Sequence, residues 1–251
     1  MFSKISQNTL VRLLKPSKEK DIQRQAIDHV PSVPSDSGSL QPKESELIVV
    51  LDLDETLICN ITSRDIPFPP YTSIDNFWLC YDYDKDRRYQ ILMRPGLIEF
   101  LQKTMSRYET HIFTAACSVV ADPILDNLEK LSGHSFGGRW YRNHCTKRGS
   151  HFVKDLSAVP RLANLNKTVL VDNNPLSFMA NPENAIPIRD FRDEPDDTSL
   201  RTLSKVLRGL EKAGNVRSVL GPHFQMQRII DDLNKTGDFL YFSSCVFRVQ
   251  L

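Results

Sequence analysis

The chain has 251 residues, which is enough for one or two domains. Apolar residues make up 40% of it and charged residues 25%, the usual mixture for a globular protein. Its 32 lysines and arginines nearly balance its 31 acidic residues, so the net charge is only +1. This balance argues against direct electrostatic binding of nucleic acid or of an anionic membrane surface. The longest stretch without Asp, Glu, Lys or Arg, residues 110–121, is too short for a membrane-spanning helix, which needs roughly 20 apolar residues.

The first 44 residues are predicted to be a flexible tail. Four prolines interrupt this segment and its apolar periodicity is weak, so ordering it would cost more free energy than burial returns. The first 18 residues carry four basic side chains and no acidic one, which leaves a mitochondrial transit peptide as the alternative interpretation. No apolar stretch precedes a small-residue cleavage site, so we expect no secretion signal.

The cysteines predict reduced thiols, because their number is odd and no CxxC pair occurs. Cys145 lies beside His144 and six residues before His151, but this spacing matches no common zinc site. We therefore expect neither a disulfide framework nor structural zinc. The five are Cys59, Cys80, Cys117, Cys145 and Cys245.

Order is predicted to begin with residues 47–51, a short, apolar, β-branched run that is typical of a strand buried in a parallel sheet. The following segment, 59–93, contains a proline-rich stretch and then two predicted strands, at 77–83 and 89–93, joined by a polar turn. We interpret this segment as a small β insertion.

Strands and helices alternate beyond this insertion. The predicted elements are a helix opened by Pro95 and reaching Tyr108, a strand at 111–113, a helix at 120–131, a strand at 168–171 and a helix at 200–210. This alternation predicts an α/β fold with a doubly wound, mostly parallel sheet. Residues 222–251 are predicted to form a C-terminal extension, with a short helix near 226–233 and a strand at 239–249.

Two carboxylates, Asp52 and Asp54, directly follow the first buried strand in a DxDxT pattern. Ligands of α/β sheets bind at the carboxyl ends of the strands, so both side chains can face one site. Together with the polar residues named next, these carboxylates match what phosphoryl transfer needs, namely a nucleophile, a hard cation and donors to the phosphoryl oxygens. Further polar residues follow later strands or lie in loops, in the order Thr114, Lys154, Asp172 and Asn173.

These residues and the segments around them resemble the haloacid dehalogenase superfamily. Within it, the chain is similar to the small phosphatases of the RNA polymerase II C-terminal domain, including the NIF-like and Dullard-type members. The resemblance covers about residues 47–220 and implies a phosphatase domain at 45–221, with the β insertion at 59–93. The segments that carry it are 51–57, 94–96, 113–115, 121–123, 152–157, 171–175 and 182–188.

The resemblance implies a catalytic pair and a metal ion. Asp52 would be the nucleophile that forms an aspartyl-phosphate. Asp54 would protonate the leaving alkoxide and then deprotonate the hydrolytic water. Mg²⁺ would be held by the Asp52 carboxylate, the Asp54 backbone carbonyl and Asn173, with water and phosphate completing the octahedron.

The resemblance also implies the residues that would surround the phosphoryl group. Thr114 would hydrogen-bond a phosphoryl oxygen, Lys154 would neutralise the charge of the group, and Asp172 would orient Lys154. Arg142 would contact the phosphorylated substrate.

The function implied by the resemblance is that of a magnesium-dependent serine/threonine protein phosphatase, acting on the RNA polymerase II C-terminal domain or a related phosphoprotein. The small insertion should leave the site open, which favours a phosphoprotein over a small metabolite. We expect a nuclear or cytoplasmic location. The alternative is a non-catalytic, mitochondrial translocase-type binding domain of the same fold, which the basic start of the chain keeps open.

Overall fold

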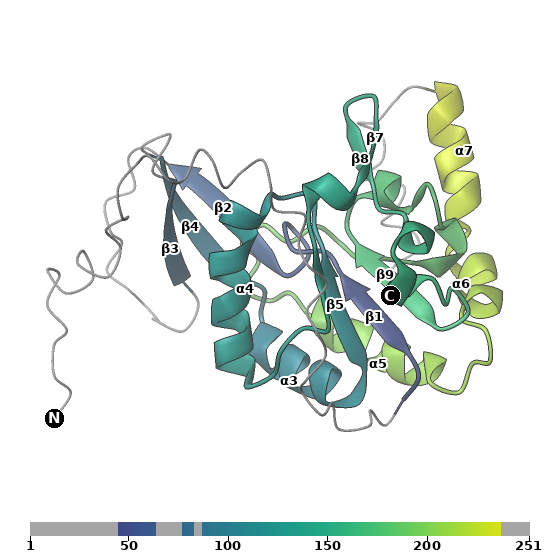
Figure 1. Ribbon diagram of the computed structural model, residues 1–251, viewed down its shortest axis with the longest axis horizontal. Coiled ribbons are helices and arrows are strands. Elements are labelled where there is room, and N and C mark those ends of the chain that lie inside the picture. The colour runs from purple at the N-terminus through teal and green to yellow at the C-terminus, as the bar shows by residue number, and fades with distance from the viewer. Residues whose placement is uncertain (1–44, 64–76, 83–86, 237–251) are drawn as a thin grey trace, which may run out of the picture. The chain divides into compact units, whose positions relative to one another are not determined.

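Five parallel strands form the central sheet, in the order β10-β9-β1-β5-β6 (Figure 1). The computed structural model describes residues 45–63, 77–82 and 87–236, so the predicted tail at 1–44 and the strand predicted at 239–249 lie outside the described residues. The sheet confirms the predicted α/β fold. Its strands are Ile48–Leu51 (β1), Glu109–Phe113 (β5), Arg139–Trp140 (β6), Thr168–Asp172 (β9) and Ala185–Pro187 (β10).

Helices and turns cover both faces of the sheet, as a doubly wound fold requires. Side chains alternate along β1, so Val49 and Leu51 pack on one face and Val50 on the other. The first face is covered by α3 (Leu97–Arg107), α4 (Ser118–Ser132), α5 (Ser199–Leu210) and α6 (Arg217–Phe224). The second face is covered by α7 (Met226–Thr236) and by 3₁₀ turns at Leu156–Ala158, Pro160–Leu162 and Pro175–Phe178. None of the described helices is both long and apolar enough to span a membrane.

The strand order places the end of β1 where a ligand site is expected. The chain leaves β1 for β5 on one side and later enters β9 on the other side of β1. In α/β sheets, ligands bind at such a switch point, outside the carboxyl ends of the strands. All five strands are parallel, so residues that follow β1, β5 and β9 gather at one edge of the sheet.

The start of α3 differs from the prediction that Pro95 opens this helix. The helix begins at Leu97, after Gly96 with φ of 77° in the left-handed region. An α-helix requires negative φ, so Gly96 ends a tight turn, which the Leu97 N–H closes onto the Arg94 carbonyl at 3.0 Å. The turn brings the chain from the preceding strand, β4 (Arg87–Met93), into the first turn of α3.

The predicted β insertion is an antiparallel sheet of three strands in the order β2-β4-β3. The strands β3 (Phe77–Asp82) and β4 (Arg87–Met93) match the two predicted strands within two residues. The third, β2 (Ile58–Ser63), has no counterpart in the prediction. The domain limits at residues 45 and 221 and the extension at 222–251 stay predictions.

His111 lies in the middle of β5 and is fully buried, with its ring 4.9 Å from that of Trp140. Its Nε2 lies 3.0 Å from Glu109 Oε1, while Nδ1 has no hydrogen-bond partner in the described part of the chain. Burial lowers the pKa of His111, against the opposing effect of the Glu109 carboxylate. The buried ring therefore stays neutral in the folded protein at pH values where it is protonated in the unfolded chain.

We therefore expect the free energy of unfolding to fall as the pH drops below about 6.5, because only the unfolded chain then gains a proton at this position. The contribution of His111 is at most about 1.4 kcal/mol per pH unit. Urea denaturation at pH 7 and pH 5 measures this fall in the free energy of unfolding, which should be smaller for His111→Phe than for the unaltered protein. The control His223→Gln, on an exposed histidine of α6, should show the same fall as the unaltered protein. An equal pH dependence in all three proteins would contradict this account.

Candidate active site

Four of the predicted site residues gather at the carboxyl edge of the central sheet. Asp52 directly follows β1, and its N–H donates to the Val171 carbonyl of β9 at 2.9 Å. Thr114 directly follows β5, Asp172 ends β9, and Lys154 follows β8 (His151–Val153). The strand β8 forms a hairpin with β7 (Thr146–Arg148), an element that the prediction missed. Asp52 and Asp172, 120 positions apart in sequence, thus meet because their strands are parallel neighbours, while Lys154 joins them from the separate β7–β8 hairpin.

A buried lysine bridges two carboxylates at this edge. Lys154 Nζ lies 2.5 Å from Asp52 Oδ1 and 2.6 Å from Asp172 Oδ2. Asp52 is 6% exposed, and Lys154 and Asp172 are each 1% exposed. Burial disfavours the charge of Lys154, but the two carboxylates outweigh this effect and raise its pKa above the usual value. The lysine therefore stays a cation, fixed beside Asp52.

Asp54 shares the site through a tight turn after β1. Glu55, at φ of 58°, adopts the left-handed conformation, and the Leu57 N–H closes the turn onto the Leu53 carbonyl at 2.9 Å. Asn60 Nδ2 donates to Asp54 Oδ1, and Thr114 Oγ1 lies 3.5 Å from Asp54 Oδ2. Burial raises the pKa of Asp54, against the opposing charge of Lys154. The turn thus holds the Asp54 carboxylate beside Thr114, in the same site as Lys154.

Asn173 is held in place by residues of the same turn. Thr56 Oγ1 donates to Asn173 Oδ1 at 3.1 Å, and Asn173 Nδ2 donates to Glu55 Oε2 at 3.2 Å. Arg94 Nη1 in turn donates to the Thr56 carbonyl at 2.9 Å. Asp197 binds the same guanidinium with both oxygens, at 2.8 and 2.7 Å. These contacts fix the amide of Asn173 with its oxygen toward Thr56.

The oxygens and charges of the site fit a hard divalent cation. Lys154 contacts the carboxyl groups of Asp52 and Asp172. Burial, together with the neighbouring Asp172 and Asp54, raises the pKa of Asp52 to about 7 against the opposing charge of Lys154, so a cation bound beside Asp52 would favour its charged form. No group of three or more His, Cys, Asp or Glu side chains forms a metal cage in the described part of the chain. Mg²⁺ needs no such cage, because it binds through one or two carboxylates plus other oxygens, water and phosphate. The Asp52 carboxylate, the Asp54 backbone carbonyl and the Asn173 amide oxygen are suitable ligands.

Arg142 lies at the exposed rim of the site, on a 3₁₀ turn after β6. Its Nε donates to the Ala115 carbonyl at 2.6 Å, next to Thr114. Its guanidinium carbon stands 5.2 Å from the centre of the Phe152 ring. Burial raises the pKa of Asp54, and the positive charge of Arg142 is one of the weaker effects that oppose this rise, so Arg142 acts at the opening of the site.

The nearby pair His144 and Cys145 is occupied by other contacts. His144 Nδ1 accepts a hydrogen bond from the Tyr141 N–H at 3.1 Å. Cys145 Sγ faces the carbonyls of Thr114 and Tyr141, both at 3.8 Å, and burial raises the pKa of this thiol to about 11. A neutral thiol in this position is a poor zinc ligand.

The structure thus brings together all seven residues named from the sequence, four of them buried, Asp54 and Asn173 half-buried, and Arg142 exposed at the rim. Sequence reasoning gave no role to Asn60, Thr56, Arg94 and Asp197, which support the site. Arg94 lies within segment 94–96, so the sequence carried a signal for it. Asp197 lies in a loop with several acidic residues, and nothing in the sequence distinguishes it from its neighbours.

Comparisons with known proteins show which family the chain resembles and which solved structure shares its fold. The model of the NLI interacting factor-like phosphatase family matches residues 47–217. The human "CTD small phosphatase-like protein" is 35% identical over 208 residues, which cover 80% of this chain and 70% of the relative. "CTD nuclear envelope phosphatase 1" of Xenopus tropicalis is 33% identical over 222 residues, covering 86% of this chain and 89% of the relative. The solved structure of Fcp1, described as an essential RNA polymerase II CTD phosphatase, shares the fold, with a TM-score of 0.58 at 18% identity over 72% of this chain and 71% of that one.

Proposed function

Because the chain belongs to the NLI interacting factor-like phosphatase family, it is a phosphatase, and we propose that it is a magnesium-dependent serine/threonine protein phosphatase that acts through an aspartyl-phosphate. The observation that carries this proposal is the contact of the buried Lys154 ammonium with Asp52 at 2.5 Å, at the carboxyl end of β1. A fixed cation beside a carboxylate nucleophile is what stabilises the charge of a transferring phosphoryl group.

In the first step, an Asp52 oxygen attacks phosphorus, and the bond between phosphorus and the seryl or threonyl oxygen breaks. Asp54 donates a proton to the leaving oxygen, so the protein product departs as an alcohol. In the second step, Asp54 takes a proton from water, the water oxygen attacks phosphorus, and inorganic phosphate and the free Asp52 carboxylate are released. The same carboxyl group therefore acts first as an acid and then as a base.

Other residues bind and orient the groups that react. Lys154 and the Thr114 hydroxyl bind phosphoryl oxygens, and Asp172 holds Lys154 toward Asp52 through its 2.6 Å contact. When bound, Mg²⁺ neutralises phosphoryl charge and lets the dianion approach Asp52. Asp52, the Asp54 carbonyl and Asn173 would hold the ion, and the Thr56 hydroxyl keeps the Asn173 oxygen in position.

The substrate we propose is phosphoserine or phosphothreonine within a polypeptide. Arg142 at the rim offers a cation that is exposed beside the opening, where neighbouring parts of a large substrate would pass. The relatives' names include RNA polymerase II C-terminal domain phosphatases and a nuclear envelope phosphatase. They favour a nuclear phosphoprotein over the mitochondrial binding-only alternative.

Removal of the metal ion is expected to lower turnover of a phosphoserine peptide by at least about 100-fold, because Asp52 then repels the substrate dianion. The measurement is phosphate release by the full chain before and after EDTA treatment, and again after excess Mg²⁺ is added back. The thermal unfolding midpoint, recorded in parallel, should show that the EDTA-treated protein is still folded. Undiminished activity of a folded, metal-free protein would refute magnesium dependence, and faster hydrolysis of sugar phosphates than of phosphopeptides would refute the proposed substrate class.

A further inference from the structure

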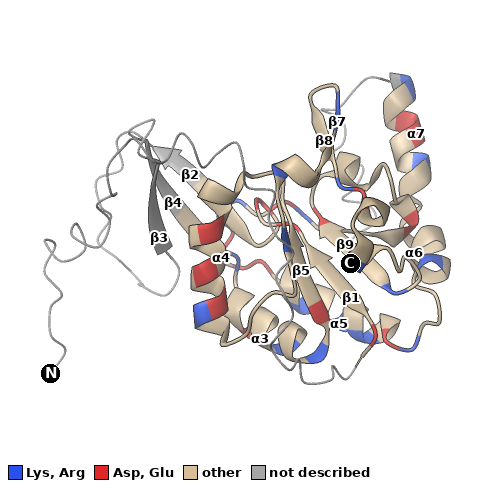
Figure 2. Cartoon of the chain, viewed as in Figure 1, with Lys and Arg blue, Asp and Glu red and all other residues tan. Residues whose placement is uncertain are grey.

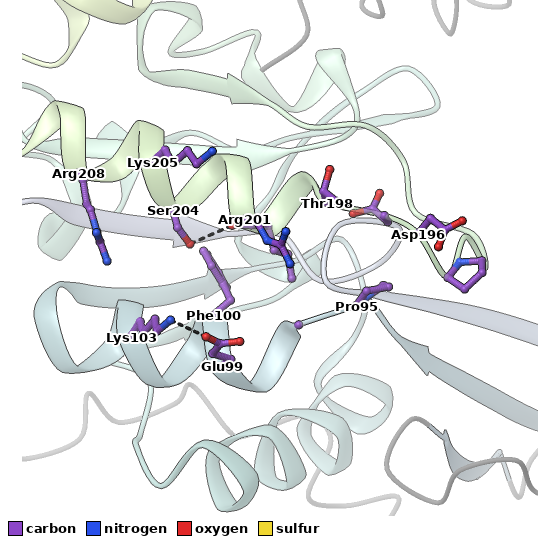
Figure 3. Close-up of a pocket in the computed structure, with 14 residues that line it drawn as sticks. Pro95, Glu99, Phe100, Lys103, Asp196, Thr198, Arg201, Ser204, Lys205 and Arg208 are labelled. Carbon is purple, nitrogen blue, oxygen red and sulfur yellow. Dashed lines mark hydrogen bonds and ion pairs between the residues drawn. The ribbon is translucent and has the colours of Figure 1, made fainter.

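A groove separate from the active site runs between helices α3 and α5 and encloses about 560 Å³ (Figure 3). The apolar base of the groove is formed by Phe100 of α3 and Leu200 of α5, which are 3% and 2% exposed. Both helices begin at the carboxyl edge of the central sheet, after Gly96 and Thr198, so one end of the groove lies near that edge. The groove is therefore a recess with an apolar base and charged rims.

One rim of the groove is a stripe of three cations on α5, at Arg201, Lys205 and Arg208. Their spacing of four and then three residues places all three on one side of the helix. All three side chains are exposed, and none forms an ion pair or hydrogen bond within the described residues. Like charges at this spacing destabilise a helix by about 0.2–0.5 kcal/mol per pair, so the stripe costs stability.

The two carboxylates that interact electrostatically with the stripe, Glu99 with Arg201 and Glu211 with Arg208, each form their ion pair with another cation. Glu99, on the opposite rim, binds Lys103 at 2.5 Å, and Glu211, beyond the end of α5, binds Arg107 at 2.5 Å. Figure 3 shows Lys103 and Glu99 paired with each other along α3. The α5 stripe thus keeps an excess of positive charge beside the groove.

A second helix shows what a stripe of this spacing can do when a counter-charge is present. On α4, Asp122, Asp126 and Glu129 have the same spacing of four and three residues, with the opposite sign. One side chain, Arg139, binds all three, at 3.1, 2.8 and 3.0 Å. The fold therefore uses one three-charge stripe, on the side of α4 that is red in Figure 2, to bind an opposite charge, whereas no side chain of the described residues forms an ion pair with the stripe on α5.

We propose that the groove between α3 and α5 binds an acidic segment of a partner polypeptide. The first and last cations of the stripe are seven positions apart, which is about 10 Å along a helix. This distance is too long for a single phosphate ion but suits several carboxylates in a chain. A recess with Phe100 and Leu200 at its base suits an apolar side chain between those carboxylates, whereas a flat membrane surface cannot enter it. Asp196 at the other end would repel acidic groups, so the acidic part of the ligand lies toward Arg208.

The test is binding of a fluorescent peptide in which glutamates at positions i, i+4 and i+7 flank leucines, followed by fluorescence anisotropy with the full chain. The double variant Arg201→Glu/Lys205→Glu should weaken binding by at least about tenfold, because two attractions become repulsions. The matched control, Lys130→Glu/Arg228→Glu, changes the net charge equally on exposed residues of α4 and α7 and should bind as the unaltered protein does. Hydrolysis of p-nitrophenyl phosphate should be equal in all three, since the substituted residues lie outside the active site.

Three results would overturn the proposal. One is no binding of the glutamate peptide by the unaltered protein at low salt. Another is equal weakening by both double variants, which would reflect general electrostatics alone. The third is binding of vesicles that contain anionic phospholipid, lost in Arg201→Glu/Lys205→Glu, without binding of the peptide, which would identify a membrane-facing surface instead. Because binding is measured without turnover, the outcome is independent of the proposed catalytic function.

Discussion

Replacement of Asp52 by asparagine is expected to lower turnover of a phosphoserine peptide by about 10⁴-fold or more, the scale seen when an enzyme loses its nucleophile. An amide of the same size cannot form the aspartyl-phosphate, because its oxygen lacks the negative charge that attacks phosphorus. Lys154 keeps its 2.6 Å contact with Asp172 in this variant, so the site should stay assembled. The measurement is phosphate release by purified variant and unaltered protein.

A second variant separates the nucleophile from the acid and base. In Asp54→Asn, the covalent step can still occur slowly while hydrolysis lacks its base, so intact-mass measurement after incubation with substrate should detect one added phosphoryl group. Asp52→Asn should never show this adduct. Asp231→Asn, on an exposed residue of α7, removes one carboxylate without entering the site and should retain full activity. Full activity of Asp52→Asn, or an adduct on it, would refute the mechanism.

The sequence was sufficient to predict how the main site residues come together. Short apolar runs that end in Asp52 and Asp172 predict buried parallel strands, and parallel strands bring their carboxyl ends to one edge. This reasoning placed Thr114 correctly as well, since it follows β5 directly. Lys154 and Asn173 carried weaker local signals, and their roles depended on the family resemblance.

The rest of the site depends on contacts that leave no local pattern in the sequence. Arg94 and Asp197 are 103 residues apart, and each lies in a loop, where neither periodicity nor spacing indicates a partner. The β7–β8 hairpin that leads into Lys154 has strands of three residues each, too short for an alternating pattern to be recognised. The left-handed conformation of Gly96 was not predicted, because Pro95 at the start of an apolar repeat also fits the first turn of a helix.

Replacement of Arg94 by methionine is expected to lower the free energy of unfolding by about 3–5 kcal/mol, because it leaves a buried carboxylate without its counter-charge. The side chains of Arg94 and Asp197 are 0% and 5% exposed, and their bidentate pair also anchors the Thr56 carbonyl behind Asn173. Urea denaturation gives the loss directly. Activity should fall too, through a weaker apparent affinity for Mg²⁺, since Thr56 positions the proposed metal ligand Asn173.

The chain contains a matched control for this effect of burial. Lys103 and Glu99 form an ion pair of 2.5 Å, shorter than the 2.7 Å of Arg94 and Asp197, but their side chains are 60% and 69% exposed. Water screens such a pair, so Lys103→Met should lower the free energy of unfolding far less than Arg94→Met does. In the double variant Arg94→Met/Asp197→Leu, the unpaired buried charge is gone, and the loss should be smaller than in Arg94→Met alone. Equal losses of unfolding free energy for Arg94→Met and Lys103→Met would show that burial does not set the strength of the Arg94–Asp197 pair. They would also contradict the claim that this pair stabilises the position of Asn173 through Thr56.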